Sequence, residues 1–160
     1  MAGHLAQAGH DVAVYNRRSE KAEKWCAAYG GSHYPTPREA AEGAAIVFSC
    51  VGNDDDLRAV ILGANGALAG MGAGAVLIDH TTTTADVARE LAAACADKAC
   101  AMLDAPVSGG EAGAVNGALT VMAGGDDANY KLWEGLSCAE ENFDKVKRLV
   151  EEEGADPNWR

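Results

Sequence analysis

The chain has 160 residues, enough for one folded domain, and its 48% hydrophobic and 23% charged residues are typical of a globular protein rather than a disordered one. Asp and Glu outnumber Lys and Arg by 24 to 13, and the net charge of −11 argues against binding to nucleic acid or to an anionic membrane surface. No apolar run reaches the about 18 residues of a transmembrane helix, and the start, MAGHLAQAGHD, does not resemble a signal peptide, so we expect a cytoplasmic protein.

Short apolar runs alternate with helical patterns along most of the chain. Gly9 and the pair Gly30-Gly31 stand where helices should end, and Ser19 and Thr36 stand where helices should begin. The pattern predicts helices over residues 1–8, 20–29, a short stretch after 37, 55–62, 83 or 84 to 96, and 111–116, and strands over 11–16, 45–51, 75–79, 99–103 and 119–123. Strands separated by helices favour right-handed βαβ units, so the predicted fold is α/β, with a doubly wound, mostly parallel sheet.

The composition changes after Gly124-Gly125, where Ala and Gly become rare and charged residues dominate. Helical spacing of apolar residues between 140 and 153 predicts a terminal helix with one polar face. We therefore divide the chain into an α/β domain over 1–127 and a divergent helical tail over 128–160.

The sequence offers no pattern of metal ligands. The five cysteines are odd in number, form no CxxC pair and have no histidine at ligand spacing from a cysteine pair. We expect free thiols and no metal.

Four polar segments follow predicted strands, and ligands of doubly wound sheets bind at the carboxyl ends of the strands. They are residues 16–19 (NRRS), 50–53 (CVGN), 79–83 (DHTTT) and 108–110 (SGG). Each also has a purely structural explanation: a solvated turn, a strand-to-helix turn, capping of the next helix by threonine, and a glycine loop. As binding segments, the first would face an adenosine ribose, where Arg17 would select NADP over NAD by pairing with the 2′-phosphate. The last would expose backbone N–H groups suited to a substrate carboxylate.

Together these segments resemble a known family. The stretches MAGHLAQAGHDVAVYNR, FSCVGNDDDLRAV, VLIDHTTTTADVARELA and above all LDAPVSGGEAGAVNGALTVMAGGD are similar to the β-hydroxyacid dehydrogenases, which include 3-hydroxyisobutyrate dehydrogenase, tartronate semialdehyde reductase and 6-phosphogluconate dehydrogenase. The resemblance covers residues 1 to about 127 and implies that they form a partial dinucleotide-binding domain of the Rossmann-like class, with the first strand and its glycine turn missing. It implies reversible hydride transfer between NADP, or NAD, and a small 3-hydroxy acid or its semialdehyde.

The resemblance also assigns roles by position. The adenosine-ribose and 2′-phosphate site falls on Asn16 and Arg17. Contacts to the rest of the cofactor fall on a larger set: Cys50, Val51, Gly52, Leu57, Thr81, Thr82 and Thr83. The loop for the substrate carboxylate falls on Ser108, Gly109 and Gly110. The family's catalytic lysine has no counterpart in this sequence, so we assign no catalytic residue and expect the isolated chain to be inactive.

A second departure concerns the family's first strand and its Gly-x-Gly-x-x-Gly turn, which this sequence does not contain. That strand normally lies between the strands predicted at 11–16 and 45–51. We expect these two to pair directly, bringing Arg17 nearer to Gly52, because unpaired strand edges are costly. A strand edge that stays unpaired would favour self-association into a homo-oligomer. Two interpretations remain open: the cofactor part of an NADP-dependent 3-hydroxyacid dehydrogenase, or a non-catalytic module that binds a nucleotide or a protein partner.

Overall fold

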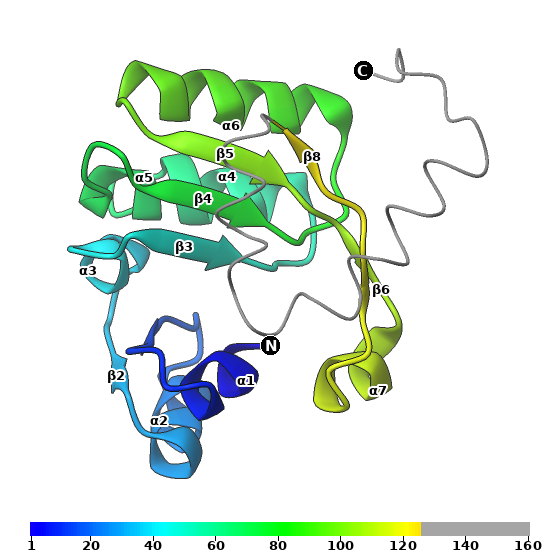
Figure 1. Ribbon diagram of the computed structural model, residues 1–160. Coiled ribbons are helices and arrows are strands. Elements are labelled where there is room, and N and C mark those ends of the chain that lie inside the picture. Colours follow the sequence, from blue (N-terminus) through cyan, green and yellow to red (C-terminus); the bar gives the residue numbers. More distant parts are fainter. Residues whose placement is uncertain (126–160) are drawn as a thin grey trace.

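The computed structural model describes residues 1–125, and the predicted terminal helix at 140–153 lies outside this range. Its elements alternate as the sequence predicts (Figure 1). In chain order they are α1 (Ala2–Gln7), β1 (Ala13–Val14), α2 (Ser19–Tyr29), β2 (Ser32–His33), α3 (Pro37–Ala41), β3 (Ile46–Ser49), α4 (Asp54–Leu62), α5 (Ala67–Gly70), β4 (Val76–Asp79), α6 (Ala85–Asp97), β5 (Ala101–Asp104), β6 (Val107–Ser108), α7 (Gly110–Val115), β7 (Thr120–Val121) and β8 (Gly124–Gly125).

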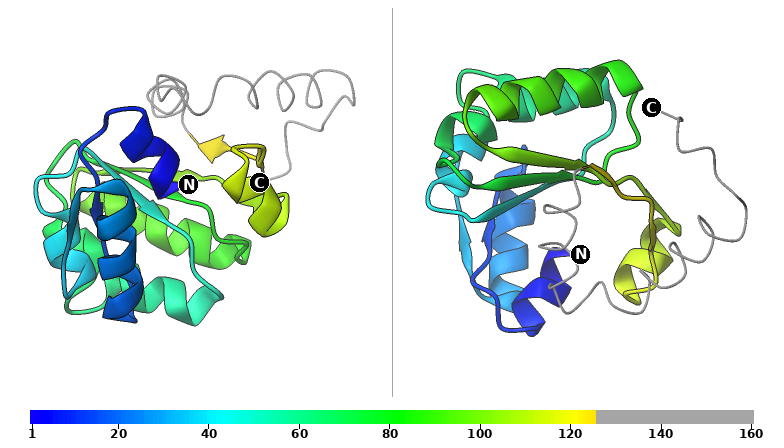
Figure 2. Two further views of the ribbon diagram at one scale, coloured as in Figure 1. Left: turned by 90° about the horizontal axis from the view of Figure 1, so that it is seen from below. Right: turned by 45° about the horizontal axis from the view of Figure 1, so that its top comes forward.

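The main sheet has the strand order β3-β4-β5-β8, in which the first three strands are parallel and β8 runs antiparallel to β5. One face of this sheet packs against α4, α5 and α6 (Figure 2). Leu57, Leu77, Val87 and Leu91 are fully buried between the sheet and these helices. The predicted Rossmann-like class, α/β with a mostly parallel sheet, is confirmed.

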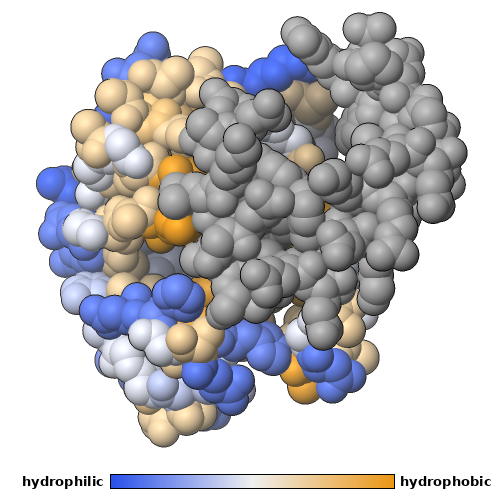
Figure 3. Space-filling model, in the orientation of Figure 1, coloured by the Kyte–Doolittle hydropathy of each residue, from blue (hydrophilic) through white to orange (hydrophobic). Residues whose placement is uncertain are grey.

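β3 is less buried than its apolar sequence predicts. All four residues of β4 are buried, but Ile46, Val47 and Phe48 of β3 are only half-buried. The reason is that, among the described residues 1–125, β3 lies at the edge of the sheet and pairs with β4 alone. Figure 3 shows apolar surface in the region of β3 and β4.

The expected pairing between β1 and β3 is wrong. β1 pairs with β2 in a separate parallel two-stranded sheet, with Ala13 opposite Ser32 and Val14 opposite His33. No sequence pattern predicts β2, which has only two residues, Ser32 and His33, and no apolar run. Pairing with β2 satisfies the backbone hydrogen-bonding groups along one edge of β1. The β1–β2 pair and the helices α1 and α2 lie beside β3 as a separate group of elements (Figure 1).

The helix ends follow the predicted chemistry in part. Thr36 caps α3 by accepting a hydrogen bond from the Glu39 backbone N–H, with Pro37 at the first helical position. Ser19, expected as the cap of α2, is instead its first residue, and Asn16 Oδ1 accepts the N–H of Arg18 just before it. Within residues 1–125, no helix is long and apolar enough to cross a membrane.

Candidate functional site

Three polar side chains lie next to one another where the parallel strands end. Ser49, Asp79 and Asp104 are aligned by the register of β3, β4 and β5. Asp79 is fully buried, and its Oδ1 accepts hydrogen bonds from Ser49 Oγ at 2.7 Å, Thr81 Oγ1 at 2.7 Å and Thr81 N at 3.2 Å. Its Oδ2 is buried with no hydrogen-bond partner among the described residues. Burial, followed by the nearby charge of Asp79, raises the pKa of Asp104.

Thr81 joins the two loops that follow β3 and β4. Its hydroxyl donates to Asp79 and accepts a hydrogen bond from the Val51 backbone N–H at 3.1 Å. Because Thr81 is only 2% exposed, its hydroxyl is committed to the protein interior. Of the predicted threonines, Thr82 is exposed and Thr83 is half-buried, so these two lie nearer the solvent.

The segment after β3 forms the surface of this edge. Cys50 and Gly52 are exposed and Val51 is half-buried. Partial burial of the thiol, and then the charge of Asp79, raise the pKa of Cys50. Leu57, predicted to lie near the cofactor, is fully buried in the core beneath the sheet, so its side chain does not reach this surface.

An ion pair brings Arg17 to the segment after β3 even though β1 and β3 do not pair. Arg17 Nη1 lies 3.0 Å from Asp56 Oδ1. Asp56 in turn bonds to Asn53 twice, through its backbone N–H to Asn53 Oδ1 at 2.8 Å and through Oδ2 to Asn53 Nδ2 at 3.2 Å. The Arg17 side chain is 82% exposed, so it keeps donors available to a ligand. Asn16 is exposed beside it.

The predicted substrate loop lies at the junction of β6 and α7. Ser108 is exposed, and Gly109 and Gly110 adopt φ angles of 130° and 62°, a conformation that favours glycine. Within residues 1–125, no hydrogen bond or ion pair joins these three residues to the segments at 16–19, 50–53 or 79–83. The loop stands on the same side of the molecule as the carboxyl ends of β3, β4 and β5 (Figure 1).

His80, which lies in the predicted segment 79–83 but has no predicted role of its own, belongs to the same edge. Its ring is buried, stacks on Phe48 with 5.7 Å between centroids, and holds Nδ1 2.7 Å from the Ala105 carbonyl oxygen. Burial lowers the pKa of His80. A neutral ring that donates from Nδ1 to this carbonyl is the form that these contacts favour. The position of His80 directly after a buried strand is the sequence signal that could have indicated a role at this edge.

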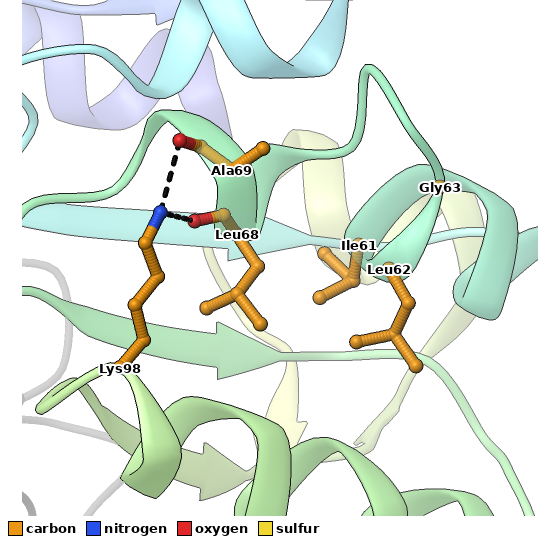
Figure 4. A pocket seen from close by; sticks show the side chains of 6 residues that line it. All are labelled: Ile61, Leu62, Gly63, Leu68, Ala69 and Lys98. Atoms are coloured by element: carbon orange, nitrogen blue, oxygen red, sulfur yellow. Dashed lines mark hydrogen bonds between the residues drawn. The ribbon is translucent and has the colours of Figure 1, made fainter.

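A hollow of about 260 Å³ opens at the other end of the strands, near the start of β5 (Figure 4). The apolar side chains of Ile61, Leu62 and Leu68 line it, and Lys98 Nζ donates to the carbonyl oxygens of Leu68 and Ala69. Lys98 therefore satisfies the last carbonyls of α5, and the hollow is separate from the predicted site.

Comparison with known proteins identifies the family. Residues 1–139 match the NAD binding domain of 6-phosphogluconate dehydrogenase. The chain is 62% identical over 130 residues to an uncharacterized oxidoreductase of Shewanella frigidimarina, covering 81% of this chain and 45% of that protein. It is 43% identical over 137 residues to the probable 3-hydroxyisobutyrate dehydrogenase-like 1, mitochondrial, of Arabidopsis thaliana, covering 85% of this chain and 41% of the relative.

Solved structures agree with these relatives. The 3-hydroxyisobutyrate dehydrogenase of Salmonella typhimurium superposes with a TM-score of 0.76 at 27% identity, covering 91% of this chain and 48% of that one. The chain spans about half the length of the relatives it matches. Fold, family match and relatives together show that this chain belongs to the NAD-binding domain family of 6-phosphogluconate dehydrogenase, whose members include the 3-hydroxyisobutyrate dehydrogenase-like oxidoreductases.

Proposed function

We propose that the chain is the cofactor-binding part of an NADP-dependent oxidoreductase that acts on a small 3-hydroxy acid or its semialdehyde. The observation that carries the proposal is the exposed Arg17 guanidinium, held by Asp56 beside the segment after β3. Dehydrogenases among the relatives support the reaction class. The bound nicotinamide would supply the hydride acceptor or donor.

The donor set at this edge fits a dinucleotide. Arg17 offers the paired N–H donors that match a 2′-phosphate, with Asn16 as the neighbour of the adenosine ribose. Cys50, Val51 and Gly52 would line the surface along which the cofactor lies. Gly52 is exposed, so it leaves the backbone open to close approach.

The threonines divide into two roles in this proposal. Thr82 and Thr83 would meet the nicotinamide ribose, and Thr81 would hold the loop behind them through Asp79 and the Val51 N–H. Ser108, Gly109 and Gly110 would receive the substrate carboxylate through backbone N–H groups. A cytoplasmic location, the domain boundary near residue 127 and a homo-oligomer remain predictions from the sequence.

Calorimetric titration of the 160-residue chain with NADPH, and with NADH for comparison, tests the proposal. We expect micromolar NADPH binding, weaker binding of NADH, and loss of the difference in Arg17→Gln. The Arg18→Gln variant, which removes the same charge from the next residue, should keep the preference. A folded sample that binds neither cofactor refutes the proposal and favours a non-catalytic module that binds another partner.

A further inference from the structure

Asp56 lies between Arg17 and the turn at 50–53, and both of its carboxylate oxygens have partners. Oδ1 accepts from Arg17 Nη1 at 3.0 Å, and Oδ2 accepts from Asn53 Nδ2 at 3.2 Å. The Asp56 side chain is 31% exposed while that of Arg17 is 82% exposed. Asn53 therefore anchors the carboxylate, and the carboxylate holds the exposed guanidinium of Arg17.

This arrangement places a negative charge against the group that would read a phosphate. A guanidinium paired with a carboxylate attracts a second anion less than a free one, because the two charges offset each other at short range. The pair is exposed, and exposed ion pairs are weak enough for an incoming phosphate to replace the carboxylate. NAD carries a hydroxyl at the 2′ position and meets no such competition.

We propose that Asp56 is a specificity-determining residue that moderates the preference for NADP over NAD by competing with the 2′-phosphate for Arg17. The inference rests on the proposed function, in which Arg17 contacts that phosphate. It assigns to Asp56 a role beyond the capping of α4, which Asn53 already provides by accepting the Asp56 N–H. Removing the charge should therefore change cofactor choice with little effect on the helix.

The test is the Asp56→Asn variant, which keeps the shape of the side chain and its backbone N–H. Exposed ion pairs contribute about 0.2–1 kcal/mol, which corresponds to about a 1.5–5-fold change in an equilibrium constant. We expect NADPH to bind about 2–5-fold more tightly to Asp56→Asn. NADH binding should stay within about 1.5-fold, because no phosphate competes at that position.

Asp55→Asn is the matched control, since it removes the same charge from the same turn of α4. The Asp55 side chain is 97% exposed and lies 3.5 Å from Arg58 rather than from Arg17. It should leave the ratio of NADPH to NADH affinity unchanged. In an Arg17→Gln background, Asp56→Asn should also lose its effect, because the competition requires the guanidinium.

The outcomes separate this inference from the function on which it rests. An unchanged ratio in Asp56→Asn, an equal shift in Asp55→Asn, or a shift that persists without Arg17 overturns the inference while leaving NADPH binding intact. Weaker NADPH binding in Asp56→Asn overturns it too, since the carboxylate would then position Arg17 for the phosphate. A folded wild-type chain that binds neither cofactor refutes the proposed function, and the inference with it.

Discussion

Replacing Thr81 by valine keeps the shape of the side chain but removes the hydroxyl that joins the loops after β3 and β4. That hydroxyl donates to the buried Asp79 carboxylate at 2.7 Å and accepts the Val51 N–H at 3.1 Å. Thr81→Ser is the matched control, because it keeps the hydroxyl and loses only a methyl group. The comparison isolates the two hydrogen bonds from the packing of the side chain.

The structure sets the size of the expected difference. A hydrogen bond to a charged group contributes about 1.5–3 kcal/mol, and a buried donor left without an acceptor costs about 1–3 kcal/mol. The Val51 N–H is only half-buried and gains partial hydration, so its share lies at the low end. We expect Thr81→Val to lower the free energy of unfolding by about 2–4 kcal/mol, and Thr81→Ser to lower it by about 1 kcal/mol.

Urea unfolding followed by circular dichroism measures both variants against the wild-type chain. The denaturant slope should stay constant, so that the shift in midpoint reports stability alone. If the two variants have the same free energy of unfolding, the hydroxyl does not stabilise this edge, and the hydrogen bonds that join Asp79, Thr81 and Val51 contribute little to stability.

Three further predictions concern neighbouring residues. Leu57→Ala should lower the free energy of unfolding in urea by about 2–5 kcal/mol, because it leaves a cavity at a fully buried position. The NADPH affinity of the folded protein should stay unchanged. Lost affinity at unchanged stability would instead show that Leu57 contacts the cofactor. Cys50 should react slowly with iodoacetamide near neutral pH and faster as the pH rises, because its pKa is raised. Bound NADPH should lower the labelling of Cys50 but not that of half-buried Cys26, as measured by peptide mass spectrometry. Equal labelling of Cys50 with and without NADPH would contradict this. The folded-state pKa of His80 is lowered, so its contribution to stability is present above its ordinary pKa of about 6.5 and is lost as the pH falls below 6.5 and through the lower folded-state pKa. Melting temperatures between pH 8 and 5 should therefore fall less steeply in His80→Asn, and equal slopes would show that His80 is not responsible.

The elements that the sequence predicts best are those whose burial is decided by a long local pattern. The residues of β4 are all apolar until Asp79, and those of α6 place Val87, Leu91 and Cys95 on one face. Such patterns have one low-energy solution, since each buries a continuous apolar surface. The two-residue strands β2 (Ser32–His33) and β8 (Gly124–Gly125) consist of polar residues or glycine and lie in no apolar run, whereas β1 and β7, which are equally short, lie in apolar runs that predict them.

The pairing of β1 failed to follow from the sequence for a different reason. An apolar run indicates a strand but carries no information about its neighbour. Direct pairing of β1 with β3 was expected only because it would leave fewer strand edges unpaired. Ser32 and His33 provided an edge at short sequence distance. Closing a short loop costs less entropy than joining distant segments, which favours this local partner.

The candidate site shows the same limit at the level of single side chains. Position along the strands was enough to bring residues 50–53 and 79–83 to one edge, but it could not distinguish Thr81, which turns inward to Asp79, from Thr82, which is exposed. Asp79 was included in the predicted segment 79–83, but its role as the buried acceptor for Ser49 and Thr81 did not follow from its position. Which threonine hydroxyl bonds inside the protein depends on the position of a buried acceptor, and only the three-dimensional structure shows that position.

The net charge of −11 does not decide the affinity for an anionic cofactor, because charges separated by more than about 8–10 Å are largely screened at physiological ionic strength. The groups in direct contact with Arg17 matter instead, and within residues 1–125 Asp56 is the acid that pairs with it. If this view is right, added salt should weaken NADPH binding less in the wild-type chain than in Asp56→Asn, where the phosphate meets an arginine that has no competing carboxylate. Titrations at low and high salt measure this difference, and identical salt dependence in the two proteins would mean that the distributed charge, rather than the Arg17–Asp56 pair, governs the encounter.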